Sequence, residues 1–496
     1  MTLPAGRDLL ISNRAPIAFI DHAGSLRASR GAGGVVTALR DLVRLAPVTW
    51  LASATSTADL RAARMRLEHG GLFGGGRLAL RPVPLARERA EAHREFADRI
   101  LWFAQHGIWD RRIRPEAPDR VRWLLAGYRI ASRAFADAAL SESHRPGYSG
   151  TTLVHDYQLY LVPRLIRERL PGAALAHFTH IPWPPLTRWL AAVPPDVVAQ
   201  LAAGLLAADV VHFQTKASVE SFAACVDALL PDAEVGDGWI RRGGHRTLVR
   251  ARPVSIDPRA LRARPALIER LRADPRRLVV RVDRADPIKN VPAGFLAFER
   301  MLELRRDLVG TVRFRARIIP TRMSMPEYAA ELELARTIAR RIDERFGAGT
   351  VEMVERADRP RALAELAAAD VVLVNSRADG MNLVAKEAAV LNPRLALVLS
   401  RRTGAYEELA DGSIGIDPAD IEGTAGALAR AVEMPEPERA ARATSLHRKV
   451  LSWTSSDWVR AQLDDLAEAR ADADVRRPAQ PTRGHPPGSV IVARGA

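Results

Sequence analysis

Short apolar runs recur along the chain, and most are followed by a segment with helical periodicity. These runs predict buried strands at residues 8–14, 46–53, 151–157, 173–182, 208–215, 277–284, 312–320 and 369–376. Apolar residues at helical spacing fill most gaps, most clearly over residues 291–304 and 328–347. Strands that alternate with helices favour parallel sheets covered by helices on both faces, so the pattern predicts an α/β fold.

The rhythm of strands and helices changes near residues 254–267, with one alternating unit before it and one after. We therefore expect two doubly wound domains, at residues 1–257 and 258–470. Residues 471–496 are rich in Pro, Gly and Arg with little apolar periodicity, which predicts a disordered tail. Ligands bind at the carboxyl ends of strands in open α/β sheets, so the pattern predicts a site in a cleft shared by the two domains.

The amino-acid composition limits the kinds of protein that this chain can be. The 496 residues are 47% hydrophobic and 26% charged, as in globular proteins. No apolar run approaches the roughly 20 residues of a membrane-spanning helix, and the first residues do not resemble a signal peptide. The single cysteine, Cys225, excludes an intramolecular disulfide framework. We therefore expect a cytoplasmic protein without a membrane partner. The sequence contains no cluster of residues with the spacing of a zinc site, so we expect no metal.

The formal net charge of +15 raises the question of nucleic-acid binding. Arginine accounts for nearly all of the 73 basic residues, since the only lysines are Lys216, Lys289, Lys386 and Lys449. The arginines are scattered among acidic residues, and no helix-turn-helix, finger or RNA-binding signature accompanies them. We therefore expect small-molecule substrates and no nucleic acid. The sequence leaves the oligomeric state open.

Two polar residues follow predicted strands of the first domain. Asp156 and His180 each come directly after an apolar run, so we expect them at the same edge of the sheet. The alternatives are a structural hydrogen-bonded histidine and an aspartate that caps the helix after it. In the same domain, Gly31, Gly33 and Gly34 open a helix after a strand that ends at Arg14, and can bring backbone amides close to an anion. An ordinary loop is the alternative there, and the spacing does not match the dinucleotide fingerprint.

Two cations follow a predicted strand of the second domain. Arg284 and Lys289 lie between the strand at 277–284 and the helix at 291–304. Two cations beside a helix N-terminus can bind a diphosphate, and a solvated loop is the alternative.

The stretch "RADGMNLVAKE" (377–387) forms a polar turn between a predicted strand and a predicted helix. Its backbone amides can face an anion, and Glu387 can accept two hydroxyls, as on a ribose. An ordinary surface ion pair is the alternative. Taken together, these strand ends predict a nucleoside diphosphate site that faces a hydroxyl-rich partner.

These residues lie in blocks that resemble the signature blocks of the trehalose-6-phosphate synthases, which are retaining enzymes of glycosyltransferase family 20. The blocks are "SNRAP", "VHDYQL", "HIPWP", "VDRADPIKN", "DGMNLVAKE" and "LVLSRRTGAYEEL". They follow one another in the family order over about residues 8–465. The resemblance implies a GT-B fold, in which two Rossmann-like domains face a central cleft. The first would bind the acceptor and the second the nucleotide sugar, and the last helix would be able to pack back on the first domain.

The resemblance also implies roles for individual residues. Implied catalytic residues are Arg284, Lys289, His180 and Asp379. Implied donor-binding residues are Gly33, Gly34, Arg284, Lys289, Met381, Asn382, Leu383, Val384 and Glu387. Implied acceptor-binding residues are Arg14, His93, Trp102, Asp156 and Arg322. The implied reaction needs neither a metal nor a cofactor, because the leaving diphosphate takes the acceptor proton. The implied donor is UDP- or GDP-glucose, and the sequence leaves the base open.

Several positions depart from the family pattern. His93 stands where the family has a tyrosine near the acceptor phosphate, Gln158 replaces a histidine, and "DPIKN" replaces "DYxKG". Similar variants occur in pseudo-glycosyltransferases of validamycin-type pathways, although those enzymes lack the "GMNLVAKE" block that this chain retains. The leading hypothesis is transfer of glucose to glucose 6-phosphate, which gives α,α-trehalose 6-phosphate. One alternative is a family-20 enzyme with a cyclitol phosphate or a nucleoside-like sugar as acceptor. Another is a basic regulatory protein on a degenerate transferase fold.

Overall fold

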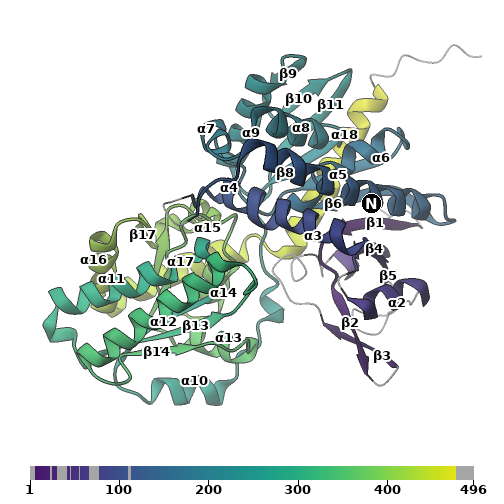
Figure 1. Ribbon diagram of the computed structural model, residues 1–496. Helices are drawn as coiled ribbons and strands as arrows, with labels where there is room; N and C mark the ends of the chain where they lie inside the picture. Colours follow the sequence, from purple (N-terminus) through teal and green to yellow (C-terminus); the bar gives the residue numbers. More distant parts are fainter. Residues whose placement is uncertain are drawn as a thin grey trace, which may run out of the picture.

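The structure is a computed structural model that describes residues 6–22, 25–30, 39, 42–44, 46–54, 56–65, 78–109 and 113–475. It forms two lobes, each built on a parallel sheet (Figure 1). The first sheet has nine strands in the order β5-β4-β1-β6-β7-β8-β11-β10-β9. Their bounds are β1 (Arg7–Ser12), β4 (Val48–Ser53), β5 (Leu78–Val83), β6 (Tyr148–His155), β7 (Ala174–Phe178), β8 (Val210–Phe213), β9 (Ala233–Gly236), β10 (Trp239–Arg242) and β11 (His245–Ala251).

The second sheet has six parallel strands in the order β14-β13-β12-β15-β16-β17. Their bounds are β12 (Arg277–Arg284), β13 (Val312–Ile319), β14 (Val351–Val354), β15 (Val371–Val374), β16 (Ala396–Ser400) and β17 (Ile414–Ile416). In the first sheet β10 runs antiparallel to both of its neighbours, β9 and β11, and the other described strand pairs are parallel. A separate hairpin pairs β2 (Ile17–His22) with β3 (Ser25–Arg30).

Helices connect the strands and cover both faces of each sheet (Figure 1). Those of the first lobe are α2 (Thr57–Met65), α3 (Arg87–Glu95), the π-helix η1 (Phe96–Leu101), α4 (Trp102–His106), α5 (Pro118–Ser143), η2 (Tyr157–Leu159), α6 (Val162–Arg167), α7 (Leu186–Leu190), α8 (Pro195–Leu205) and α9 (Lys216–Leu229). Those that follow are η3 (Pro258–Ala260), α10 (Pro265–Arg272), η4 (Pro287–Lys289), α11 (Val291–Leu304), η5 (Arg306–Leu308), α12 (Pro326–Phe346), α13 (Arg359–Ala368), α14 (Leu383–Leu391), α15 (Gly404–Leu409), η6 (Ala410–Gly412), α16 (Ile421–Val432), α17 (Glu436–Leu451) and α18 (Ser455–Val475).

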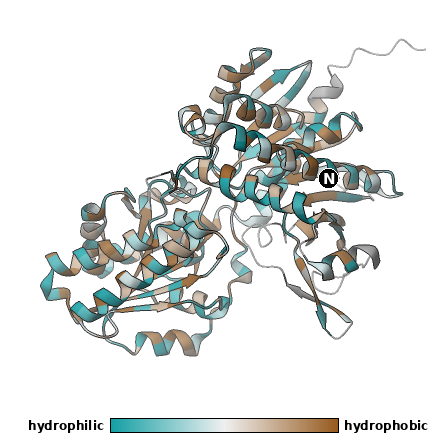
Figure 2. Ribbon diagram, in the orientation of Figure 1, coloured by the Kyte–Doolittle hydropathy of each residue, from teal (hydrophilic) through white to brown (hydrophobic). Residues whose placement is uncertain are grey.

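Local sequence accounts for most of these elements. The run Val371–Val374 is buried at every position, as expected of a strand covered on both faces. Thr215, Asp358 and Asp420 cap α9, α13 and α16, and each side chain accepts a hydrogen bond from a backbone amide of the first turn. Apolar residues gather on the strands and on the inner faces of the helices (Figure 2).

Every strand that the apolar runs predict is present, and the helices predicted at 291–304 and 328–347 are α11 and α12. The strands β9 to β11 were not predicted, because they lie in a polar antiparallel stretch whose pairing depends on neighbours in the sheet. The apolar runs also did not predict β2, β3, β5, β14, β16 and β17. The predicted domain boundary at residue 257 falls between the last strand of the first sheet and the first strand of the second.

The last helix of the described chain returns to the first lobe. α18 packs on β7, β8 and β11, and the carboxylate of Asp465 lies 3.0 Å from Nε2 of His212. The helix continues to Val475, past residue 471, where the predicted tail begins, because the Ala-rich sequence there favours continued helix. The remainder of that segment lies outside the described residues.

The stretch that joins the two sheets is held by side chains of the second lobe. Lys386 is buried, donates a hydrogen bond of 2.8 Å to the Val254 carbonyl and pairs with Glu408. Trp453 donates to the Pro253 carbonyl over 2.7 Å. Buried apolar residues of both sheets therefore meet in one hydrophobic cluster around this connection.

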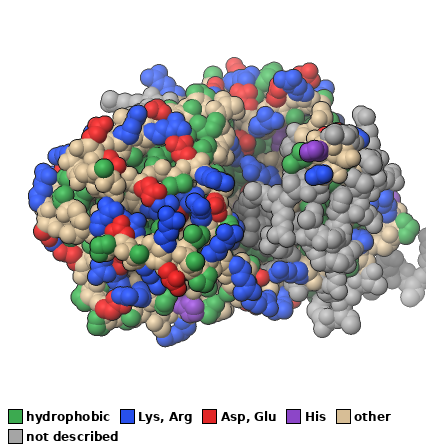
Figure 3. Space-filling model, turned by 90° about the horizontal axis from the view of Figure 1, so that it is seen from below, with side chains coloured by type: hydrophobic (Ala, Val, Ile, Leu, Met, Phe, Trp, Pro, Cys, Tyr) green, Lys and Arg blue, Asp and Glu red, His purple; other side chains and the backbone are tan. Residues whose placement is uncertain are grey.

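Acidic and basic side chains are interspersed over the face of the second lobe that Figure 3 shows. Many arginines in that lobe form ion pairs, such as Arg305 with Glu433 and Arg336 with Glu355. Among the described residues, no helix is long and apolar enough to cross a membrane.

Candidate active site

The two lobes touch where β7 and β15 end. A Cβ atom built on Gly380 would lie 2.0 Å from the carbonyl oxygen of His180, which is backbone of the other lobe. Only glycine fits such a close approach. The predicted strand-end residues of both lobes therefore line one interface, as the sequence pattern indicates.

Cations of the second lobe stand at the end of β12. Lys289 forms an ion pair with Asp379, and its Nζ lies 4.0 Å from a carboxylate oxygen of Asp283. Arg284 pairs with Asp286 over 3.2 Å. The same Asp286 carboxylate accepts a hydrogen bond from the Ile288 amide and caps the short helix η4. Both cations are therefore held at the carboxyl end of the sheet, where an anionic ligand can reach them.

The polar turn before α14 positions Asp379. Asn382 has φ of 78°, its side-chain oxygen accepts from the Ala385 amide, and its side-chain nitrogen donates to Asp379 over 3.1 Å. Burial would raise the pKa of Asp379, but the ammonium of Lys289 and the amide of Asn382 hold this pKa below its ordinary value. Asp379 is therefore a carboxylate that only accepts hydrogen bonds.

Glu387 lies on the second turn of α14 and is buried, with 8% of its surface exposed. It pairs with Arg359 of α13 over 2.9 Å, so the ion pair joins two helices and is not between residues of one helix. Burial raises the pKa of Glu387, against the opposing effect of Arg359. The Arg359 side chain is half exposed, so this pair reaches the protein surface on its arginine side.

The Trp102 ring lies near two cations of the second lobe, Arg284 at the end of β12 and Arg322 in the turn after β13. The guanidinium of Arg322 is 4.7 Å from the ring centroid and that of Arg284 is 5.6 Å from it. The indole Nε1 also donates to Asp286 over 3.4 Å. This ring of the first lobe thus connects an implied acceptor residue with an implied donor residue.

Arg322 is itself fixed by three partners. It forms an ion pair of 2.8 Å with Asp98 and donates to the hydroxyl groups of Tyr157, over 3.0 Å, and Tyr328, over 2.7 Å. Asp98 and Tyr157 belong to the first lobe, so this network also crosses between lobes. Arg322 has φ of 50°, a conformation that these contacts stabilise.

Asp156 and His180 lie together, as predicted. Asp156 has φ of 81° and makes no side-chain cap hydrogen bond to η2; instead it accepts from the His180 amide over 3.2 Å. The helix-cap interpretation of Asp156 is therefore wrong. Burial raises the pKa of Asp156 to about 7, although nearby backbone amides and the charge of Arg14 act in the opposite direction. Burial also lowers the pKa of His180 to about 3, so His180 is neutral.

His93 is placed differently from the other implied acceptor residues. It is buried within the first lobe, its Nε2 lies 3.0 Å from the Gln158 carbonyl, and its ring stacks on Tyr128 at 5.4 Å. Burial lowers its pKa, while the Gln158 carbonyl and Asp98 oppose this shift. The Asp98 carboxylate also pairs with Arg322, over 2.8 Å. Gly33 and Gly34 lie outside the described residues.

The sequence model of glycosyltransferase family 20 matches residues 6–468. The chain belongs to glycosyltransferase family 20. It is 32% identical over 475 residues to the validamine 7-phosphate valienyltransferase of Streptomyces hygroscopicus subsp. jinggangensis, covering 93% of this chain and 94% of that protein. It is 31% identical over 495 residues to the trehalose-6-phosphate synthase of Mycolicibacterium smegmatis, an alignment that covers 94% of this chain and 93% of that protein.

Solved structures of other proteins are similar to this one. A UDP-forming trehalose-phosphate synthase from Burkholderia xenovorans, in complex with glucose-6-phosphate, superimposes with a TM-score of 0.76 at 27% identity, covering 93% of this chain and 100% of that one. The N-terminal domain of a Candida albicans trehalose-6-phosphate phosphatase gives a TM-score of 0.81 at 23% identity, which shows the fold alone. The predicted family and GT-B fold are confirmed, and the chain is a family-20 glycosyltransferase.

Sequence reasoning missed several residues of this family-20 site: Asp98, His106, Tyr157, Asp286 and Tyr328. His106 follows Trp102 by four positions, so helical spacing could have placed both on one face of α4. Asp286 lies within the quoted block "VDRADPIKN", between the two implied cations. No local signal marks Asp98 or Tyr328, because their roles depend on contacts between distant segments.

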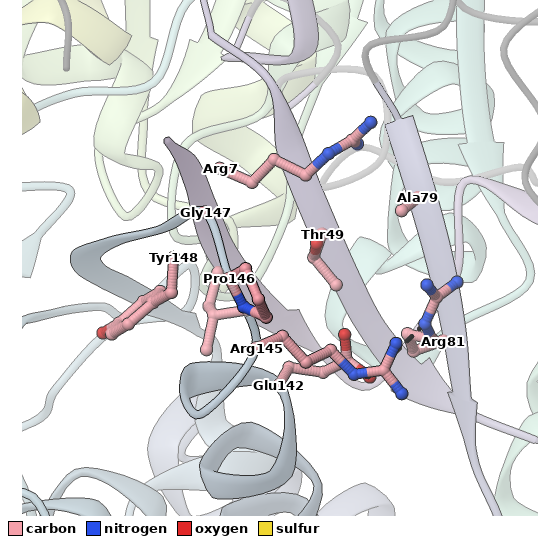
Figure 4. A pocket seen from close by; sticks show the side chains of 10 residues that line it. Arg7, Thr49, Ala79, Arg81, Glu142, Arg145, Pro146, Gly147 and Tyr148 are labelled. Atoms are coloured by element: carbon pink, nitrogen blue, oxygen red, sulfur yellow. Dashed lines mark ion pairs between the residues drawn. The ribbon is translucent and has the colours of Figure 1, made fainter. Parts of the chain in front are cut away.

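A cavity of about 280 Å³ lies away from the lobe interface, at the amino ends of β1, β4 and β5 (Figure 4). The Glu142 carboxylate in it is shared by Arg81, at 3.4 Å, and Arg145, at 3.1 Å. Ligands of open α/β sheets bind at the opposite, carboxyl ends, so we assign this cavity no part in the transfer reaction. Among the described residues, no group of His, Cys, Asp and Glu could hold a metal ion.

Proposed function

We propose that the protein transfers glucose from a nucleoside diphosphate glucose to glucose 6-phosphate with retention, and so makes α,α-trehalose 6-phosphate. The observation that carries this proposal is Trp102, whose ring lies against both Arg284 and Arg322. A donor held by Arg284 and an acceptor phosphate held by Arg322 would then meet over one aromatic surface. The activities for which the mycobacterial and Burkholderia relatives are named support the same reaction.

The donor diphosphate would bind to Arg284 and Lys289. Lys289 is paired with Asp379 in this structure, so the diphosphate would compete with that carboxylate for the ammonium. Its release would leave Asp379 able to accept hydrogen bonds from the sugar hydroxyls. We place the ribose at Glu387, and the backbone of Met381, Asn382, Leu383 and Val384 around the diphosphate and sugar.

The acceptor would bind on the first-lobe side. Arg322 presents a fixed guanidinium to the phosphate, Arg14 adds a second cation, and the Trp102 ring supports the sugar. Asp156 would accept from an acceptor hydroxyl beside His180. His93 would act on this subsite through Asp98, since its own ring nitrogen is bonded to Gln158.

The reaction would proceed on one face of the sugar. The bond between C1 and the diphosphate oxygen breaks, the bond between C1 and the acceptor hydroxyl oxygen forms, and the departing diphosphate takes the hydroxyl proton. Arg284 and Lys289 stabilise the negative charge that develops on the leaving group, which lowers the barrier. These two cations supply the charge that a metal ion provides in other transferases, so we propose no metal cofactor.

A second candidate acceptor is a cyclitol phosphate. His93 replaces the family tyrosine and is turned to a backbone carbonyl, and a relative of 32% identity is named as a valienyltransferase that acts on validamine 7-phosphate. The donor side is the same in both candidates.

Two measurements test the proposal in sequence. Thermal unfolding with UDP, GDP and ADP should show stabilisation by at least one of them, because a ligand that binds only the folded state raises the unfolding temperature. Release of that nucleoside diphosphate from its glucose conjugate is then measured with glucose 6-phosphate. Absence of any stabilisation contradicts a nucleotide-sugar transferase. Stabilisation without release favours the second acceptor.

A further inference from the structure

His106 occupies the end of α4, next to the Trp102 ring. It is buried, with 2% of its surface exposed, and the two ring centroids are 4.3 Å apart. Its Nδ1 lies 2.7 Å from the carbonyl oxygen of Trp102, one helical turn earlier. The imidazole is therefore held in a single orientation by its own helix.

That hydrogen bond determines the tautomer. A carbonyl oxygen only accepts, so Nδ1 must carry the hydrogen, and in a neutral ring Nε2 is then an acceptor with a lone pair. The ring is neutral at physiological pH, because burial lowers the pKa of His106 to about 4. Since Nδ1 faces back along α4, Nε2 points away from the helix.

Nε2 of His106 is buried and has no hydrogen-bond partner within the described part of the chain. A buried acceptor without a donor is unfavourable, so such an atom is often completed by a ligand. The charges that act on this imidazole belong to Asp379, Asp286 and Lys289, all on the donor side of the interface. Asp379 is ionised and cannot donate, and Lys289 is engaged with it.

We propose that Nε2 of His106 accepts a hydrogen bond from a hydroxyl group of the transferred sugar. A hydroxyl can donate to Nε2 while it accepts from a cation of the donor side, and the Trp102 ring next to His106 lies 5.6 Å from the guanidinium of Arg284. His106 is then a specificity-determining residue for a hydroxylated donor, because an analogue without that hydroxyl leaves Nε2 unpaired. The inference rests on the proposed donor site, but not on the identity of the acceptor.

Substitution of His106 by asparagine or by glutamine distinguishes the roles of the two ring nitrogens. His106→Asn keeps an N–H near the Nδ1 position and removes the acceptor at Nε2, whereas His106→Gln places an amide group near Nε2. His245→Asn is the control, because His245 also bonds a backbone carbonyl, that of Ala208, and lies on β11. Calorimetry compares binding of the nucleoside diphosphate alone with binding of its glucose conjugate.

We expect His106→Asn to weaken binding of the glucose conjugate about three- to tenfold, the worth of one net hydrogen bond, and to leave binding of the nucleoside diphosphate unchanged. His106→Gln should recover part of the loss, and His245→Asn should lose nothing. Equal loss for both ligands, or none for either, overturns the inference. A wild-type protein that binds neither ligand contradicts the proposed function, and this is seen before any variant is compared.

Donors that lack one hydroxyl identify the contact. For each deoxy donor, the kcat/KM of wild type is divided by that of His106→Asn. This ratio should exceed one for every deoxy donor except the one that lacks the contacting hydroxyl, for which it should be about one. If the ratio is the same for all deoxy donors, His106 has only a structural role. If His106→Asn does not fold, His106→Gln is compared with wild type over the same donors: a ratio that changes at one position supports the contact, and a uniform ratio overturns it.

Discussion

Lys289 and Asp379 form an ion pair that joins the end of β12 to the turn before α14. Side chains of both residues are largely buried, at 12% and 14% exposure. A buried pair whose partners are each suited to a ligand can be exchanged for ligand contacts at low cost, because neither charge is left uncompensated. Donor binding would therefore replace this ion pair with two contacts, one from Lys289 to the diphosphate and one from Asp379 to the sugar.

Removing a donor-side cation tests this arrangement. Arg284→Ala and Lys289→Ala should each reduce turnover at least tenfold, because a charge-assisted contact to the leaving group contributes about 1.5 to 3 kcal/mol. Steady-state release of nucleoside diphosphate measures the effect. Lys449→Ala, on the exposed face of α17, is the control and should keep wild-type turnover. Unchanged turnover in Arg284→Ala and Lys289→Ala would contradict their assignment.

The contact between Gly380 and His180 predicts a steric effect. Gly380→Ala should reduce turnover at least tenfold, since the new methyl group meets backbone at 2.0 Å and must push Asp379 away from the first lobe. The matched control is Gly426→Ala in α16, where a Cβ atom meets nothing within 4 Å. That control should gain about 0.5 to 1 kcal/mol of stability, measured by denaturant unfolding. Full activity in Gly380→Ala would show that the lobes do not approach this closely in solution.

Asp156 makes stability depend on pH. Its folded-state pKa is about 7, above its ordinary value of 3.8, so between these values the folded protein binds more protons than the unfolded chain. The free energy of unfolding should therefore fall as pH rises from about 4 to 7, through this group, and level off above 7. Denaturant midpoints of wild type and Asp156→Asn at pH 5 and pH 8 isolate the effect, because the buried histidines contribute equally to both. A difference between the two proteins that does not change with pH would contradict the raised pKa.

Arg322 should act on the acceptor alone. Arg322→Lys keeps the charge but loses the planar group that lies over Trp102 and reaches Asp98 and Tyr328. We expect kcat/KM for glucose 6-phosphate to fall at least tenfold, while binding of the nucleoside diphosphate, measured by calorimetry, stays within twofold. A matching loss in nucleotide binding would place Arg322 on the donor side instead.

Local sequence patterns predict most of the strands and helices that carry the site and many of the polar residues at their ends. Apolar runs and helical periodicity are local properties, so strands such as β12 and β15 and helices such as α11 follow from the residues within them. Polar residues directly after such strands indicate the edge where ligands bind. This is why Asp156, Arg284 and Lys289 could be selected before any contact was known.

Which of these residues come into contact depends on the tertiary structure. Trp102 and Arg322 are far apart in the chain, and their contact depends on strand order and on how the lobes pack, which no local pattern encodes. The same holds for Asp98 beside Arg322 and for Gly380 against His180. His106 shows the difference: its spacing from Trp102 is visible in the sequence, but the unpartnered Nε2 depends on everything packed around α4. Local periodicity determines elements, whereas a site is a sum of long-range contacts that exists only once those elements are packed.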